Sequence, residues 1–242
     1  MIGEREIKAV KHNTILDNGL FDVFSGFRHG QSNWSKPRLS LGKRVMDIVL
    51  SISMLIALFP LYTMIAILIK MHDGGTVFFK QRRIGVDGQE FYCYKFRTMV
   101  ANAEDRLAAV LANDPVAAEE WRQFKKLKND PRVTSLGRFI RKTSLDELPQ
   151  LINILRGEMS VIGPRTITRA EAPDYGSPAD FSVYCSVRPG VLGLWQISGR
   201  SDTGFDRRVK LDVKYVREWS LMADIAILFK SVPAVLFGKG AY

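Results

Sequence analysis

Two adjacent carboxylates, Asp146 and Glu147, follow a basic pair at 141–142. The run from Ser144 to Glu147 matches the S-x-x-E capping box, which predicts that the pair begins a helix over 144–157. A helix N-terminus stabilises a carboxylate as the anion by a few tenths to about 1 kcal/mol. An ionised Asp is a competent nucleophile toward phosphorus, and an adjacent Glu can help to hold a divalent metal. Helix capping alone also explains both carboxylates, so the pair by itself leaves catalysis and capping open.

Arginines beside rigid turns are the second chemically suggestive feature. Each of them lies next to a Gly, Pro or Ser element, and they are Arg138, Arg141, Arg165, Arg188 and Arg200. A planar guanidinium suits bidentate binding of phosphate oxygens where a turn fixes its direction. Scattered surface arginines are the ordinary alternative, but five such placements beside one acidic pair favour a diphosphate pocket.

Composition narrows the function classes. The 242 residues carry 35 Lys plus Arg against 25 Asp plus Glu, so the net charge of +10 favours anionic partners. An apolar share of 46% excludes a largely disordered chain. Cys93 and Cys185 are the only cysteines, which excludes a disulfide scaffold and a four-cysteine zinc site. The sequence has no P-loop motif.

An uncharged apolar run from Ile48 to Ile69 predicts residence in a membrane. A straight helix of that length would reach roughly 33 Å, enough to span a bilayer. Pro60 divides the run into halves that are each too short to cross. Both flanks are basic, with Lys43 and Arg44 before the run and Lys70 after it. The positive-inside rule therefore favours a re-entrant hairpin with both ends on the cytoplasmic side, and a kinked transmembrane helix is the alternative.

The remaining pattern predicts an α+β, mostly helical fold with one small β-hairpin and interfacial amphipathic helices. Strands are expected at 77–79 and 90–96 around a Gly85–Gly88 turn, and helices at 102–111, 114–128, 135–142, 144–157 and 207–219. Residues 172–180 are expected to form a loop. The apolar stretch 219–237 is predicted to be an amphipathic helix on the membrane surface, with a plain core helix as the alternative. The predicted domains are a polar, disordered cytosolic arm (1–40), a membrane anchor (41–72) and a catalytic domain docked on the membrane surface (73–242).

Five segments carry a resemblance to a known family. They read KRVMDIVL, GTVFFKQRRIG, FYCYKFRTM, RKTSLDELPQLINILRGEMSVIGPR and RPGVLGLWQISGR. From about Leu41 to Tyr242 the chain resembles the bacterial sugar transferases, a family of monotopic polyprenyl-phosphate phosphoglycosyl transferases. The short length with one membrane segment most resembles the undecaprenyl-phosphate galactose phosphotransferases of exopolysaccharide synthesis.

The resemblance implies a reaction, partners and a location. A sugar 1-phosphate, from galactose or glucose, would pass from a UDP-sugar to undecaprenyl phosphate with release of UMP. Asp146 would form an aspartyl-phosphosugar, and Glu147 would assist. Mg²⁺ would be held by Asp146 and Glu147. The enzyme would lie on the cytoplasmic face of the cell inner membrane in contact with membrane lipid, and the sequence leaves a homo-oligomer open.

The resemblance also assigns binding and anchor positions. The substrate-binding residues would be Lys95, Arg97, Arg138, Arg141, Arg165, Arg188, Gln196 and Arg200, and the anchor residues Lys43, Arg44, Asp47 and Pro60. Two positions depart from the common family pattern, because Phe59 stands where many members have Ser and Thr166 where many have Pro. Neither departure touches the acidic pair.

Two other function classes are compatible with parts of the sequence. A non-catalytic basic membrane scaffold would recruit synthesis partners through its charge and would tolerate Asp146→Asn. A nucleic-acid binder fits worse, because no helix-turn-helix, zinc finger or ribonucleoprotein motif is present and the apolar run would have no role. We therefore predict no nucleic-acid partner.

Overall fold

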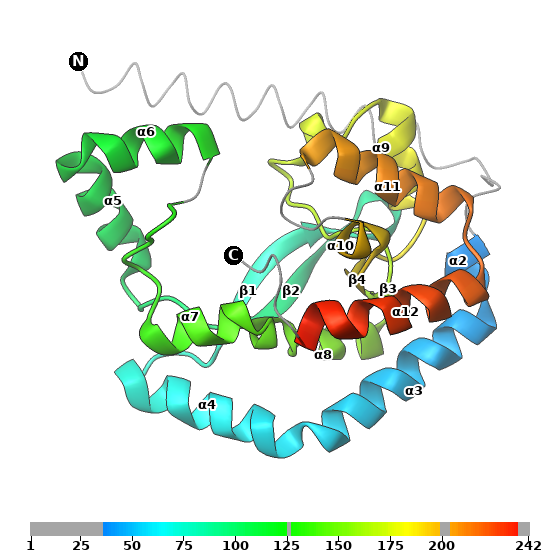
Figure 1. Cartoon of the computed structure of the whole chain (residues 1–242), viewed down its shortest axis with the longest axis horizontal. Coiled ribbons are helices and arrows are strands. Elements are labelled where there is room, and N and C mark those ends of the chain that lie inside the picture. Colours follow the sequence, from blue (N-terminus) through cyan, green and yellow to red (C-terminus); the bar gives the residue numbers. More distant parts are fainter. Residues whose placement is uncertain (1–35, 125–126, 199–203, 237–242) are drawn as a thin grey trace.

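A computed structural model describes residues 36–124, 127–198 and 204–236 (Figure 1). Of the predicted disordered arm at 1–40, residues 1–35 lie outside the described residues, whereas 36–39 form a short helix and Ser40 caps the next one, so the arm is wrong over its last five residues. The helices are α2 (Lys36–Leu39), α3 (Leu41–Ala57), α4 (Phe59–Asp73), α5 (Ala103–Asn113), α6 (Pro115–Phe124), α7 (Ser135–Lys142), α8 (Gln150–Arg156), α9 (Pro178–Cys185), α10 (Leu194–Ile197), α11 (Phe205–Arg217) and α12 (Leu221–Leu236). The strands are β1 (Phe78–Ile84), β2 (Glu90–Phe96), β3 (Ser160–Ile162) and β4 (Gly190–Leu192). The mostly helical α+β prediction is confirmed.

Helices α3 and α4 form one bent pair along the lower edge of the molecule (Figure 1). Leu58 separates them, their axes differ by 64°, and Pro60 lies in the first turn of α4, where its missing N–H is not needed. Among the described helices none is long and apolar enough to cross a membrane alone, whereas this pair passes by length and composition together. The predicted break near Pro60 is confirmed, and the membrane placement stays a prediction.

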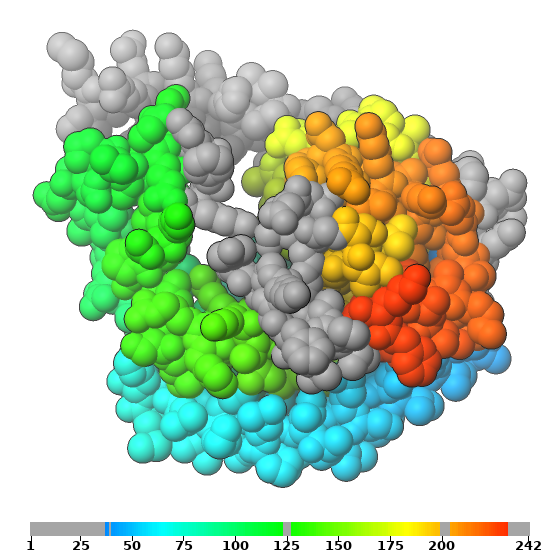
Figure 2. Space-filling model, in the orientation of Figure 1, coloured from blue at the N-terminus to red at the C-terminus, as the bar shows by residue number. Residues whose placement is uncertain are grey.

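The outward side of the bent pair is apolar. Large exposed hydrophobic side chains on it are Leu41, Val45, Val49, Ile52, Met54, Ile56, Phe59, Met64, Ile67, Leu68 and Met71. In the space-filling view the two helices form one continuous border of the molecule (Figure 2). Exposed apolar area of this extent marks an interaction surface.

Two small sheets stand above the bent pair. The hairpin β1–β2 is antiparallel, with Gln81 opposite Cys93, and β3 pairs in parallel with β4. The predicted hairpin is confirmed with a longer first strand, while the β3–β4 pair was not predicted. Neither three-residue strand carries a run long enough to signal a strand in the sequence.

Two buried clusters hold these elements together. The larger one joins α8, β3, α9, α11 and α12 through side chains such as Ile154, Ile162 and Tyr184. The smaller one packs Ile65 and Ile69 of α4 against Phe96 of β2 and Ile140 of α7. The bent pair is therefore part of the fold on its inner side.

Lys43 and Asp47 of the predicted anchor motif are buried within the protein. Lys43 Nζ donates to Asp224 Oδ2 (2.7 Å) and to the Ile162 carbonyl (2.8 Å), and Tyr215 Oη donates to Asp224 Oδ1 (2.8 Å). Asp47 Oδ1 accepts from the Ser160 hydroxyl and from the Val161 amide, both at 2.9 Å. We call Lys43, Asp47, Ser160, Tyr215 and Asp224 the anchor network.

Arg44 also joins α3 to the rest of the protein, at the end of α8. Its guanidinium donates to the Ile154 carbonyl at 2.7 Å and to the Leu155 carbonyl at 2.9 Å, which are among the last acceptors of that helix. The two basic residues that precede the apolar run, Lys43 and Arg44, therefore bond to β3, α12 and α8, and the re-entrant topology stays a prediction.

The helix predicted over 144–157 is wrong in its first half. Ser144 adopts a left-handed conformation (φ 57°) and its side chain caps nothing, so the capping box does not form. A 3₁₀ turn covers Leu145–Glu147, and α8 begins only at Gln150. Pro149 explains the interruption, because it lacks the N–H that would bond back to Leu145. The predicted end at Gly157 (φ 81°) is confirmed.

One further expectation needs correction, and another stays open. The expected loop at 172–180 contains the start of α9, which begins at Pro178 with a capping box between Ser177 and Asp180. Helix α12 buries Asp224 and Ile227 against the body and exposes Met222 and Phe229. The helix thus packs one face into the body and exposes apolar side chains on another, and its placement on a membrane surface stays a prediction.

Candidate active site

The acidic pair lies in the 3₁₀ turn between α7 and α8, beside strand β2. Lys95 Nζ is 2.7 Å from Glu147 Oε1 and 3.6 Å from Asp146 Oδ2. Lys95 therefore ties Glu147 by a charge-assisted hydrogen bond and leaves Asp146 at the longer distance. Two acids and one base are brought within reach of one another by residues more than fifty positions apart.

The flanking helices fix this turn against β2. The fully buried Asn153 of α8 accepts from the Tyr94 amide (3.0 Å) and donates to the Tyr92 carbonyl (2.7 Å), so it pairs with the strand like a backbone unit. On α7, Arg141 Nε donates to the Thr98 hydroxyl at 2.8 Å. These contacts set Lys95 opposite the acidic turn.

Burial and charge separate the two acids. The pKa of Asp146 is raised to about 6, because burial and the neighbouring Glu147 charge together outweigh the lowering effects of Lys95 and Arg141. Burial also acts on Glu147, but Lys95 and then Arg165 and Arg83 outweigh it and lower the pKa of that carboxyl. At neutral pH Glu147 is a fixed anion, while Asp146 is ionised and more basic than an ordinary Asp.

Arg165 enters the site from a rigid loop after β3. The Gly163 amide donates to the Leu192 carbonyl (2.9 Å) and the Gly190 amide to the Pro164 carbonyl (2.8 Å). A Cβ on Gly190 would come within 2.1 Å of the Gly163 nitrogen, so the two chains approach as only glycine allows. The Arg165 guanidinium lies 5.0 Å from the centre of the Trp195 ring.

A model of the family described as bacterial sugar transferase matches residues 38–238. The chain belongs to the bacterial sugar transferase family. The resemblance read from the sequence motifs is thereby confirmed, and the chain is assigned to the transferases.

Individual relatives of this sugar transferase carry more specific names. Exopolysaccharide production protein ExoY of Sinorhizobium fredii is 49% identical over 207 residues, which cover 86% of this chain and 91% of that protein. Undecaprenyl-phosphate galactose phosphotransferase of Salmonella typhimurium is 50% identical over 213 residues, 88% of this chain and 44% of that protein. UDP-glucose:undecaprenyl-phosphate glucose-1-phosphate transferase of Escherichia coli is 39% identical over 206 residues, 83% and 41% respectively.

The structure gathers some of the predicted site residues of the sugar transferase around the turn. Asp146, Glu147 and Lys95 are in direct contact, and the charges of Arg141 and Arg165 act on the two acids. Arg200 lies outside the described residues.

Four other predicted binding residues have partners elsewhere. Arg97 pairs with Asp73 at the end of α4, and Arg138 donates to the Val133 carbonyl at 3.1 Å. Arg188 Nε donates to the Gly157 carbonyl at 2.8 Å, at the end of α8. The side chain of Gln196 accepts from the Gly193 amide and donates to the Val191 carbonyl at 3.1 Å, so it caps its own helix. Their predicted role with substrate stays a prediction.

Sequence reasoning missed one basic residue of the site, Arg83. Arg83 donates to the Thr166 carbonyl and pairs with Glu171 at 3.4 Å, and its charge acts on Glu147. Side chains alternate between the two faces of a strand, so Arg83 lies on the other face of β1 from the exposed Arg82. This alternation can be read from the sequence and could have identified Arg83.

The donor set fits a magnesium ion shared with a substrate. No cluster of three or more His, Cys, Asp or Glu residues able to hold a metal occurs among the described residues. Mg²⁺ commonly takes one or two carboxylates and completes its shell with substrate phosphates and water. Asp146 meets that need, with Glu147 beside it, although Lys95 holds the second carboxylate.

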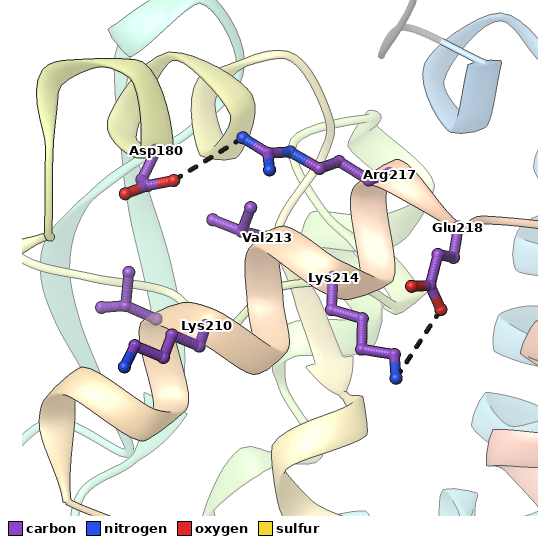
Figure 3. Close-up of a pocket in the computed structure, with 7 residues that line it drawn as sticks. Asp180, Lys210, Val213, Lys214, Arg217 and Glu218 are labelled. Atoms are coloured by element: carbon purple, nitrogen blue, oxygen red, sulfur yellow. Dashed lines mark ion pairs between the residues drawn. The ribbon is translucent and has the colours of Figure 1, made fainter.

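A separate pocket of about 350 Å³ lies between α9 and α11 (Figure 3). Its lining residues are Asp180, Val209, Lys210, Val213, Lys214, Arg217 and Glu218. None of them belongs to the predicted site, and their ionic groups already pair with one another as Arg217–Asp180 and Lys214–Glu218, each at 3.8 Å. This pocket is therefore not assigned to the reaction.

Proposed function

We propose that this sugar transferase moves a sugar 1-phosphate from UDP-galactose or UDP-glucose to undecaprenyl phosphate and releases UMP, as an early membrane step of exopolysaccharide synthesis. The names of its relatives support both sugars and the acceptor. The single observation that carries the proposal is the partly shielded Asp146 carboxylate beside a Glu147–Lys95 ion pair.

In the first step, an oxygen of Asp146 attacks the β-phosphorus of the UDP-sugar. The new bond joins that oxygen to phosphorus, and the bond between phosphorus and the bridging oxygen breaks. UMP leaves with the electron pair of that bond, and the sugar phosphate stays on Asp146. A carboxylate whose pKa is raised to about 6 is both ionised at neutral pH and a stronger nucleophile than an ordinary Asp.

In the second step, a phosphate oxygen of the polyprenyl phosphate attacks the same phosphorus. The Asp146–phosphorus bond breaks, and Asp146 regains its carboxylate while the lipid diphosphate sugar leaves. Two successive displacements predict ping-pong kinetics. Glu147, held as an anion by Lys95, stands beside the reacting carboxylate and can accept a proton from a monoprotonated acceptor phosphate.

Basic groups offset the phosphate charge in both steps. Arg165 and Arg141 place guanidinium groups around the acidic turn, where they can bind phosphate oxygens in bidentate fashion. Mg²⁺, held by Asp146 with Glu147 beside it, would add Lewis-acid stabilisation of the diphosphate when bound.

The proposed location is the cytoplasmic face of the inner membrane, with the bent pair α3–α4 entering one leaflet. The apolar outer side of that pair supports this placement, as does its bend of 64°. A soluble nucleotide sugar and a lipid-borne phosphate can meet only at such an interface. Labelling of single cysteines introduced at 1–35 from the periplasmic side would contradict the re-entrant topology.

The test of the reaction is UMP release from each UDP-sugar with undecaprenyl phosphate and Mg²⁺. Wild type, Asp146→Asn and the matched surface variant Glu218→Gln are compared. Release by wild type and Glu218→Gln but not by Asp146→Asn is expected. Equal release by Asp146→Asn would overturn the nucleophile, and no release by any variant from a panel of UDP-sugars would favour the scaffold alternative.

A further inference from the structure

Asp212 is a buried carboxylate that the reaction above does not use. It lies in α11 between the buried Val209 and Val213, and only 2% of its surface is exposed. Its Oδ2 accepts from the Tyr175 hydroxyl (3.1 Å) and from the Arg165 amide (3.3 Å). A charged side chain in such surroundings is costly unless something requires the charge.

Its hydrogen bonds alone do not explain the charge. Asp212 Oδ1 has no hydrogen-bond partner among the described residues. An Asn could accept the same two bonds with its single carbonyl oxygen. The buried Asp224 differs, because both of its oxygens have donors, with Tyr215 on one and Lys43 and Trp219 on the other.

Two guanidinium groups supply the reason for the charge. Arg165 and Arg208 each lie 5.0 Å from the centre of the Trp195 ring. Burial lowers the pKa of Arg208, and the Arg165 charge lowers it further, so the two cations repel each other at this ring. Both of them act on Asp212, which is the anion bonded to the Arg165 backbone.

We propose that Asp212 is a positioning residue that holds Arg165 in place through its backbone and, by its charge, lets Arg165 and Arg208 stand together as a paired cation site for the diphosphate of a nucleotide. The inference rests on the proposed function only for the identity of that ligand. Arg208 becomes a binding residue that the sequence motifs did not identify. Tyr175 donates to the same oxygen of Asp212 as the Arg165 amide and is assigned no contact with substrate.

A double-mutant cycle on nucleotide affinity tests the inference. The dissociation constant of UDP is measured by calorimetry at about pH 8, above the pKa of about 7 to which burial raises Asp212. The four proteins are wild type, Asp212→Asn, Arg165→Gln and the double variant. Asp212→Asn is expected to weaken UDP binding about tenfold in wild type but less than about twofold in Arg165→Gln, because it acts through Arg165.

Controls separate positioning from loss of folding. Glu218→Gln removes one negative charge from the exposed far end of the same helix and is expected to leave UDP affinity unchanged. If Asp212→Asn does not fold, as judged by its thermal transition, the cycle is repeated with Tyr175→Phe, which removes one donor to the same carboxylate. Its effect must also vanish in Arg165→Gln.

The outcomes are distinct from those of the proposed function. Equal weakening by Asp212→Asn in both backgrounds, or no weakening in wild type, overturns the positioning role. UMP release by wild type is measured in the same preparations. If wild type releases no UMP while the double-mutant cycle still shows coupling between Asp212 and Arg165, the proposed reaction is overturned and the role of Asp212 stands.

Discussion

The anchor network and the acidic turn are both clusters of opposite charge, yet they are built differently. In the anchor network, Lys43 and Asp224 are almost fully buried and both oxygens of Asp224 have donors. In the acidic turn, Lys95 reaches Glu147 closely and Asp146 only at 3.6 Å, and all three side chains keep some contact with solvent. A fully bonded buried pair holds one arrangement, whereas an incompletely bonded one keeps a group available for chemistry.

The anchor network and the acidic turn also lie in different parts of the fold. The anchor network joins the bent pair to β3, and β3 leads directly into the loop that carries Arg165. It therefore supports the site from a distance without sharing a residue with it. Substitutions in the two regions should separate stability from catalysis.

Removal of the Asp146 carboxylate should give the largest effect. Asp146→Asn keeps the size of the side chain but removes the nucleophile, and we expect kcat to fall at least about 10⁴-fold. Steady-state UMP release measures it. A fall of less than tenfold would mean that another group attacks phosphorus.

Lys95→Met should have the next largest effect. It leaves Glu147 without its cation and removes the main charge that lowers the pKa of Asp146. We expect kcat to fall about 10²- to 10³-fold. Because the pKa of Asp146 then rises above about 6, the acidic limb of the pH–rate profile should move to higher pH. If the acidic limb does not move, the charge of Lys95 does not set the pKa of Asp146.

Lys43→Met should affect stability instead of chemistry. Breaking a buried ion pair typically costs about 3–5 kcal/mol, and the lower end applies because Tyr215 and Trp219 still donate to Asp224. The expected fall in Tm is about 6–12 °C. The kcat of the folded fraction should stay within about threefold of wild type. A large loss of kcat at unchanged Tm would place Lys43 in the catalytic machinery.

The stability of Asp146→Asn should change in the opposite direction to that of Lys43→Met. The folded-state pKa of Asp146 is raised from 3.8 to about 6, so ionisation above about pH 6 destabilises the fold by up to about 3 kcal/mol. That cost is absent below about pH 4, where the group is protonated in both states. Asp146→Asn should therefore raise Tm at pH 8 and not at pH 4, as measured by thermal unfolding.

Local signals predicted much of the fold. Asp114 caps α6 by accepting from the Val116 and Ala117 amides, as Asp-Pro indicates, and α7 begins and ends where the sequence predicts. The capping box at Ser144 failed because Pro149 interrupts the helix one turn later. Propensity at the start of a segment was outweighed by a single residue further along.

Long-range partners could not be predicted. The acidic pair and Lys95 were identified as site residues, but the sequence does not indicate that Lys43 pairs with Asp224, 181 positions away. Asp212 on α11 gave no signal either, because a lone Asp in a charged helix is typical of a solvated face. Both carboxylates acquire their roles only once the fold buries them.

The most direct test of the account is mass spectrometry of the protein after incubation with UDP-galactose or UDP-glucose in the absence of acceptor lipid. We predict a covalent hexose phosphate on the peptide that contains Asp146, which disappears when undecaprenyl phosphate is added. Asp146→Asn should carry none. Release of UMP only when the acceptor is present, with no adduct on that peptide, would contradict the two-step mechanism.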